Sequence, residues 1–163
     1  GSMGFGQIKE IVVNILAQIP NAYLVVICGS NEKLKNDLDA IINPNLIVKG
    51  FVNNMNDYMA ASKVVISKPG GLTTTEIAAL RKPLVHMMPI PGVEDYNANF
   101  FANNKMSIRA NNINEIVDAT KKLLSDKMLR EELMINQRKL INKYSAKSLV
   151  EYVLKYMNDE EVL

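Results

Sequence analysis

The sequence predicts an α/β fold in which a mainly parallel, Rossmann-like sheet is flanked by helices. Short apolar runs rich in β-branched residues, such as residues 64–66, are typical of strands buried on both faces of a parallel sheet. These runs alternate with segments of helical periodicity, and such alternation indicates βαβ units. With 163 residues, of which 48% are hydrophobic, the chain is long enough for one domain with its own core.

Each element follows from its local pattern. Pro20–Asn21 stop the first helix, Pro69 stops a strand, Pro83 starts the next, and Asn111–Asn112 open a late helix. In chain order, the expected strands span residues 23–28, 45–49, 64–66, 84–88 and 105–108. The expected helices span residues 8–19, 32–42, 54–61, 73–80, 95–104, 113–124, 126–144 and 146–157. The last helices close the domain, and residues 158–163 are expected to fray.

Composition excludes several classes of protein. The net charge of +2, without a basic run interleaved with aromatic residues, argues against nucleic acid binding. The sole cysteine, Cys28, has no partner within the chain and fits a reducing cytosol. The longest apolar runs fall short of a membrane span, so at most peripheral contact with a membrane is expected. Ser30–Asn31 carry no carboxylate where a strand ends, which argues against a dinucleotide-dependent dehydrogenase.

A glycine-rich turn joins the strand at residues 64–66 to the next helix. Gly70 and Gly71 allow another molecule to approach the main chain closely. The threonines at 73–75 start the helix, where N–H groups and the helix dipole favour a phosphate. Thr73 and Glu76 also have the spacing of a capping box, and the turn alone leaves the two interpretations open.

A second polar loop favours the interpretation of the glycine-rich turn as a ligand site over that as a helix cap. Residues 91–95 follow the next strand and open the next helix, so both loops are expected at the same carboxyl edge of the sheet, where ligands bind. Asn97 follows this loop and either reaches the ligand or only solvates the first turn of the helix. Lys68 is placed to neutralise phosphate charge, although most lysines point to solvent.

Both loops resemble the donor half of glycosyltransferases of the monogalactosyldiacylglycerol synthase and processive diacylglycerol glucosyltransferase type. These are relatives of the enzyme that adds N-acetylglucosamine to the lipid-linked peptidoglycan precursor. The resemblance rests on residues 67–73, 76–80, 89–94 and 97–98, and it extends to about Ala110. It implies the C-terminal domain of a two-domain GT-B fold that binds a UDP-sugar.

The resemblance also implies roles for individual residues. Glu76 holds the ribose hydroxyls, the turn from Gly70 to Thr74 faces the diphosphate, and Glu94 with Asp95 faces the sugar. The turn after residues 45–49 lies beside uracil, with Phe51 or Val52 as a wall, although Phe51 is equally expected as ordinary core. The donor-binding candidates are Gly4, Gly50, Phe51, Val52, Lys68, Gly70, Gly71, Leu72, Thr73, Thr74, Glu76, Pro91, Gly92, Glu94, Asp95 and Asn97.

Residues 1–163 are therefore expected to be the nucleotide-sugar-binding domain of a longer enzyme. Gly1–Ser2 are either a scar of tag removal or the end of a phosphate loop that includes Gly4. A Rossmann-like unit places a strand before this loop, so the first strand and an N-terminal domain are expected to be absent and a sheet edge to be open or filled by another chain.

The expected reaction is hexosyl transfer from a UDP-sugar to a lipid acceptor, in the cytoplasm at the membrane periphery. The catalytic base belongs to the absent N-terminal half, so no catalytic residue is assigned in this chain. The one Asp-x-Asp spacing, Asp37-Leu38-Asp39, lies in the predicted helix at residues 32–42, where both carboxylates are expected on its solvated face. No cofactor or metal is therefore expected beside the donor.

Two other functions remain open at this stage. A UDP-sugar 2-epimerase shares the GT-B fold but needs more acidic and histidine residues than the lone His86 provides. His86 lies within a strand without partners for metal binding, so a structural role is expected. A non-catalytic module that senses nucleotide or docks a partner is the other alternative.

Overall fold

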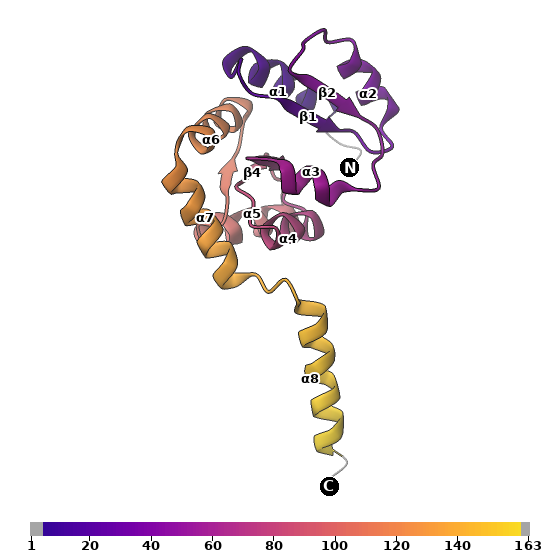
Figure 1. Ribbon diagram of the computed structural model, residues 1–163, viewed down its shortest axis with the longest axis vertical. Coiled ribbons are helices and arrows are strands. Elements are labelled where there is room, and N and C mark those ends of the chain that lie inside the picture. The colour runs from indigo at the N-terminus through magenta and orange to yellow at the C-terminus, as the bar shows by residue number, and fades with distance from the viewer. Residues whose placement is uncertain (1–4, 161–163) are drawn as a thin grey trace.

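The computed structural model describes residues 5–160, and it shows helices and strands that alternate along most of the chain (Figure 1). The described strands are β1 (Leu24–Ile27), β2 (Leu46–Lys49), β3 (Val65–Ser67), β4 (Leu84–Met87) and β5 (Ile108–Ala110). The described helices are α1 (Phe5–Gln18), α2 (Glu32–Asp39), α3 (Met55–Ala61), α4 (Gly71–Ala79), α5 (Val93–Asn103), α6 (Ile113–Ser125), α7 (Lys127–Leu140) and α8 (Ser145–Glu160).

All strand pairs of the described chain are parallel, as predicted, but the strands divide between two sheets. β1 pairs with β2, and β4 lies between β3 and β5. Within residues 5–160, β1 and β3 each have a strand partner on one side only. The expected single sheet is therefore split into two. The expectation that a first strand is missing and leaves one edge open stays a prediction.

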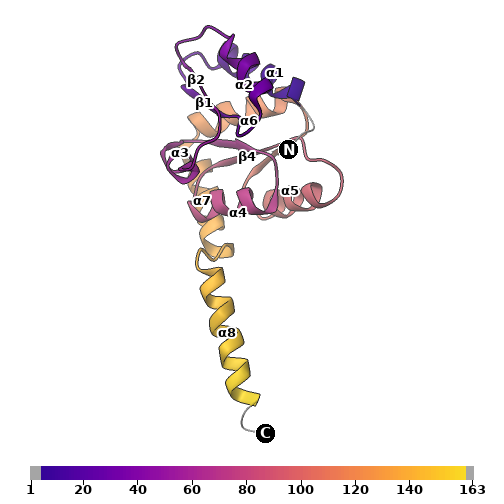
Figure 2. The same cartoon turned by 90° about the vertical axis from the view of Figure 1, so that its right-hand side faces the viewer.

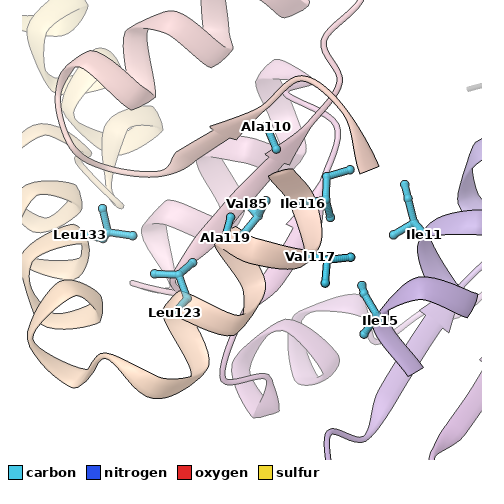
Figure 3. Packing of buried hydrophobic residues seen from close by; sticks show 9 residues of the cluster. All are labelled: Ile11, Ile15, Val85, Ala110, Ile116, Val117, Ala119, Leu123 and Leu133. Carbon is cyan, nitrogen blue, oxygen red and sulfur yellow. The ribbon is translucent and has the colours of Figure 1, made fainter. Parts of the chain in front are cut away.

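Helices cover both faces of the β3–β4–β5 sheet, whereas the β1–β2 pair packs against α1 and α2 on one face and leaves Val25 and Ile47 exposed on the other. Figure 2 shows α1, α2 and α6 on one side and α4 and α5 on the other. Along β4 the side chains alternate between these layers: Val85 packs with α1 and α6, whereas Leu84 packs with Ile77 of α4 and His86 with Phe101 of α5. Figure 3 shows the larger apolar cluster, which joins α1, α6, β4, β5 and α7.

Helix α8 projects away from the rest of the molecule (Figure 1). All its described side chains, from Ser145 to Met157, are exposed. The link before it, residues 141–144, lies in the range predicted as the end of the preceding helix, which instead ends at Leu140. The pattern predicted the helix itself.

Two helices end in a left-handed turn at a residue other than glycine. After α4 the N–H of Arg81 bonds to Ala78 and the N–H of Lys82 bonds to Ile77, with φ of 57° at Arg81. This is the Schellman arrangement, which satisfies the last carbonyls of a helix. Lys105 does the same after α5, with φ of 50°. The chain therefore turns where a strand was predicted at 105–108, and β5 begins only at Ile108.

The Arg81 side chain ties α4 to the end of α7. Its guanidinium donates to the carbonyls of Ala78 at 2.8 Å, Gln137 at 2.7 Å and Ile141 at 2.9 Å. The positive charge also lies at the C-terminal end of α7, where the helix dipole is negative. Gln137 is fully buried and donates to the carbonyls of Lys82 and Met106.

We expect Arg81→Ala to lower the free energy of unfolding by about 2 kcal/mol, because hydrogen bonds from a charged donor are lost and carbonyls at the helix ends lose their partner. Chemical denaturation of both proteins measures this loss. Arg138→Ala, at an exposed site on α7, is the control and should change stability by less than about 0.5 kcal/mol. Equal stability of the wild type and the Arg81 variant would show that these bonds are energetically unimportant.

His86 is fully buried, as the sequence analysis expected of a structural residue. Its Nε2 lies 3.2 Å from the Thr74 hydroxyl, its Nδ1 lies 3.0 Å from the Ser107 hydroxyl, and its ring meets Phe101 edge to face. Burial lowers the pKa of His86 from 6.5 to about 4. The ring is therefore neutral in the folded protein at physiological pH.

We expect the stability of the protein to fall as the pH is lowered from 6.5 to about 4. In this window the unfolded chain binds a proton at His86 that the folded chain excludes, and above pH 6.5 neither state binds it. A pKa shift from 6.5 to about 4 corresponds to a loss of about 3 kcal/mol. Denaturation at a series of pH values measures it.

The control for this prediction is His86→Gln, which has no titrating ring. Carboxylates such as Glu115, whose pKa is lowered by the Asn111 N–H, contribute to acid sensitivity in both proteins and cancel in the comparison. Parallel pH profiles for the two proteins would contradict the assigned role of His86.

Candidate functional site

The candidate site lies at the carboxyl ends of β3 and β4. These strands are parallel, and Ser67 of β3 is in register with His86 of β4. The loop before α4, residues 68–70, and the loop before α5, residues 88–92, therefore leave the same edge of the sheet. This is the arrangement that the sequence predicted for the two polar loops.

A hydrogen bond joins the two loops directly. Asn97, in the second turn of α5, donates from its side chain to the Pro69 carbonyl at 2.9 Å. Its amide nitrogen also lies 3.8 Å from the place that a Cβ on Gly71 would take. The starts of α4 and α5 are thus held side by side. The sequence interpretation offered Asn97 as a ligand contact or a solvated residue and missed this tie, which only the pairing of the loops reveals.

Helix α4 begins without a side-chain cap. Gly70 is the N-cap residue, and the first intrahelical bond runs from the Thr74 N–H to the Gly70 carbonyl at 3.0 Å. The N–H groups of Gly71, Leu72 and Thr73 precede this bond, as the first amides of any helix do. The capping-box interpretation is wrong, because the helix starts two residues earlier than predicted and Thr73 lies inside it.

The side chains of this turn point in different directions. Leu72, Thr73 and Glu76 are exposed, so the Glu76 carboxylate is accessible to a ligand. Thr74 is fully buried, and its hydroxyl contacts His86 inside the protein. The side chain of Thr74 therefore does not face the edge where the resemblance places the diphosphate. The binding roles of Gly70, Gly71, Leu72, Thr73 and Glu76 stay predictions.

The acidic residues of the second loop are partly engaged within the chain. Glu94 accepts a hydrogen bond from the Ile90 N–H at 3.1 Å and so closes its own loop after Pro91. Gly92 has φ of 107°, which disfavours a side chain there. Asp95 pairs with Arg109 of β5 at 2.7 Å. Both carboxylates therefore have partners within the chain, and their roles toward a sugar stay predictions.

The predicted uracil wall follows β2, in the other sheet. Phe51 is 81% exposed, so the alternative that it is ordinary core is wrong. Val52 is half-buried, and Gly50 closes the turn after Lys49. An exposed aromatic ring at the carboxyl end of a strand is available to stack on a base.

A cavity of about 270 Å³ lies at the same edge as the two loops. Lys68 lines it together with residues of α1, of the end of β4 and of the segment that follows, namely Gln7, Ile8, Ile11, Met87, Met88 and Ile90. Of these lining residues, the sequence analysis named only Lys68 as a binding candidate. Their position at the carboxyl edge was the one signal that could have pointed to them.

Gly4 lies outside the described residues. Within residues 5–160 no group of three His, Cys, Asp or Glu side chains is placed to hold a metal ion. In the same part of the chain, no helix is both long and apolar enough to cross a membrane.

Comparison with known proteins shows the family to which the chain belongs. Residues 1–160 match the glycosyltransferase family 28 C-terminal domain. A processive diacylglycerol β-glucosyltransferase of Staphylococcus epidermidis is 36% identical over 138 residues, which are 78% of this chain and 35% of that protein. The enzyme of the same name in Bacillus thuringiensis is 31% identical over 152 residues, 91% of this chain and 39% of that protein. The chain thus spans little more than a third of these relatives.

Solved structures share the fold at low sequence identity. The Staphylococcus aureus MnaA–UDP complex superimposes with a TM-score of 0.75 at 13% identity, covering 96% of this chain and 43% of that one. MurG of Acinetobacter baumannii superimposes with a TM-score of 0.71 at 21% identity, covering 95% and 48%. Together with the family match, these likenesses show that the chain is a glycosyltransferase family 28 C-terminal domain with the fold of the GT-B donor half.

Proposed function

We propose that this domain binds the UDP-sugar of a glycosyltransferase that transfers a hexose to a lipid acceptor. The observation that carries the proposal is the exposed start of α4. Its first amides and the exposed Glu76 follow the loop whose Pro69 carbonyl is bound by Asn97 of α5. The names of the relatives, processive diacylglycerol glucosyltransferases, support the lipid acceptor. The UDP in the structure of the similarly folded MnaA supports the nucleotide.

The domain contributes to the reaction by orienting the donor and stabilising the departing diphosphate. The amides of Gly71, Leu72 and Thr73 point along the positive end of the α4 dipole, which favours the negative charge that develops on the diphosphate. Lys68, at the edge of the adjacent cavity, adds a positive charge. Glu76 accepts hydrogen bonds from the ribose hydroxyls, Phe51 and Val52 border uracil, and Glu94 binds the sugar.

The acceptor site and the catalytic base belong to the N-terminal half of the enzyme in this proposal. The cavity and loops at this edge contain no histidine, and the one histidine of the sequence, His86, is buried in the core. The burial of His86 also disfavours the 2-epimerase alternative, because the ring cannot reach a sugar. Peripheral contact with a membrane is part of the proposal only for the complete enzyme.

The nucleotide is tested by titrating the purified chain with UDP, UDP-glucose, UDP-galactose and UDP-N-acetylglucosamine in a calorimeter. We expect weak binding of all four, with the uridine diphosphate part supplying most of the affinity, and no sugar transfer to diacylglycerol by this chain alone. ADP is the control for recognition of the base. A chain that binds none of the uridine ligands, or that binds ADP equally well, would contradict the proposal.

We expect Glu76→Gln to weaken UDP binding about tenfold, because a carboxylate accepts stronger hydrogen bonds from ribose hydroxyls than an amide does. Thermal unfolding should be unchanged, since Glu76 is exposed and Gly70 is the N-cap residue of α4. Glu131→Gln, at an exposed site on α7, is the matched control and should keep full affinity. A lower melting temperature with unchanged affinity would instead give Glu76 a structural role.

A further inference from the structure

Three polar side chains form a continuous chain through the core behind the candidate site. The Thr74 hydroxyl lies 3.2 Å from His86 Nε2, and the Ser107 hydroxyl lies 3.0 Å from His86 Nδ1. Thr74 belongs to α4 and His86 to the central strand β4, and Ser107 is the residue just before β5. Thr74 and His86 are fully buried and Ser107 almost so. We call these three residues the hydroxyl–histidine relay.

Because the His86 ring is neutral, the hydrogen bonds of the relay run in one direction, from one hydroxyl through the ring to the other. A neutral imidazole has one N–H donor and one acceptor nitrogen, so one hydroxyl donates to the ring and the other accepts from it. Ser107 borders a cavity of about 450 Å³ where its own proton can meet water, whereas Thr74 contacts only His86 with its hydroxyl among the described side chains. We therefore assign the proton to Nδ1, which donates to Ser107, while Thr74 donates to Nε2.

Thr74 connects the relay to the candidate site. Its N–H makes the first intrahelical bond of α4, to Gly70, and the three amides assigned to the diphosphate directly precede it. The backbone of Thr74 is held by Gly70 and its side chain by His86, so Thr74 fixes the position of the first turn of α4. Electrostatic stabilisation of a leaving group depends on donors that are held in position before the reaction.

The polar character of His86 has an energetic cost that packing alone does not require. The neighbouring β4 residues Leu84 and Val85 are fully buried and apolar. A hydrophobic side chain could fill the place of His86 without the desolvation that buried polar groups undergo. Its two hydrogen bonds, one toward each neighbouring element, distinguish it from a residue that only fills space.

We propose that His86 is a positioning residue that holds the first turn of α4 in the geometry that binds the diphosphate of the donor. This inference rests on the proposed function of the domain. His86 touches no substrate and acts through Thr74. Its loss is therefore expected to weaken donor binding even when the protein stays folded.

Two substitutions separate the ends of the relay. The side-chain amide of Asn reaches the place of Nδ1, so His86→Asn keeps the contact with Ser107 and loses that with Thr74. The longer side chain of Gln reaches the place of Nε2, so His86→Gln keeps the contact with Thr74. We expect UDP affinity, measured by calorimetry, to fall about tenfold in His86→Asn, as for the loss of one buried hydrogen bond, and to stay within about twofold of wild type in His86→Gln.

A matched control separates positioning from general destabilisation. Val117→Ala shortens a fully buried side chain in the apolar cluster of α6, on the opposite side of β4. It should lower the melting temperature and leave UDP affinity unchanged. If His86→Asn does not fold, Thr74→Val removes the same bond from its other end and should weaken UDP binding by a similar factor.

Nuclear magnetic resonance gives a readout that needs no ligand. The ¹⁵N shifts of the His86 ring should show the Nδ1–H form in the wild type. The Thr74 amide should exchange with solvent at least several-fold faster in His86→Asn than in His86→Gln. A merely structural role for His86 would change both variants alike.

The outcomes distinguish the two proposals. Absence of UDP binding by the unmodified chain would contradict the proposed function. Normal UDP binding by both the wild type and folded His86→Asn would overturn the relay alone, as would equal losses in the Asn and Gln variants. Weaker UDP binding by Val117→Ala, to the same extent as His86→Asn, would reduce the effect to general stability.

Discussion

The parallel pairing of β4 with both β3 and β5 is the constraint on which the rest of this structure depends. It brings the carboxyl ends of β3 and β4 together, and each end leads through a short loop into a helix. The start of α4 and the start of α5 then lie at one edge, and the bond from Asn97 to Pro69 holds them there. Antiparallel pairing would place the two loops at opposite edges of the sheet.

Polar side-chain contacts hold α4 near both of its ends. His86 joins α4 to the segment before β5, while Arg81 and Gln137 join the end of α4 to α7. Helix α4 is thus held at its first turn and just after its last. For a domain whose proposed task is to present backbone amides to a diphosphate, a helix held at both ends has little freedom to misalign its donors.

Much of the fold follows from local patterns. Every predicted helix and strand is present within the described residues, because apolar periodicity and Pro or Gly stops act on the chain locally. The errors lie at boundaries: α4 and α5 each begin two residues before the predicted start, and β5 begins after a left-handed turn at Lys105. Arg81 and Lys105 take a left-handed conformation that is more typical of glycine, so the residue types at these positions did not predict the turns.

The sequence by itself determined the order of the elements, the parallel strands, the glycine turn and the family to which its motifs belong. Only the tertiary structure decided which side chains are exposed at the candidate site and which are buried or paired within the chain. Thr74 is buried against His86, Phe51 is exposed to solvent, and Asp95 pairs with Arg109. The physical reason is that a backbone conformation is set mostly by near neighbours in the chain. The environment of a side chain is set by whichever distant segment packs against it, and that pairing exists only in the folded molecule.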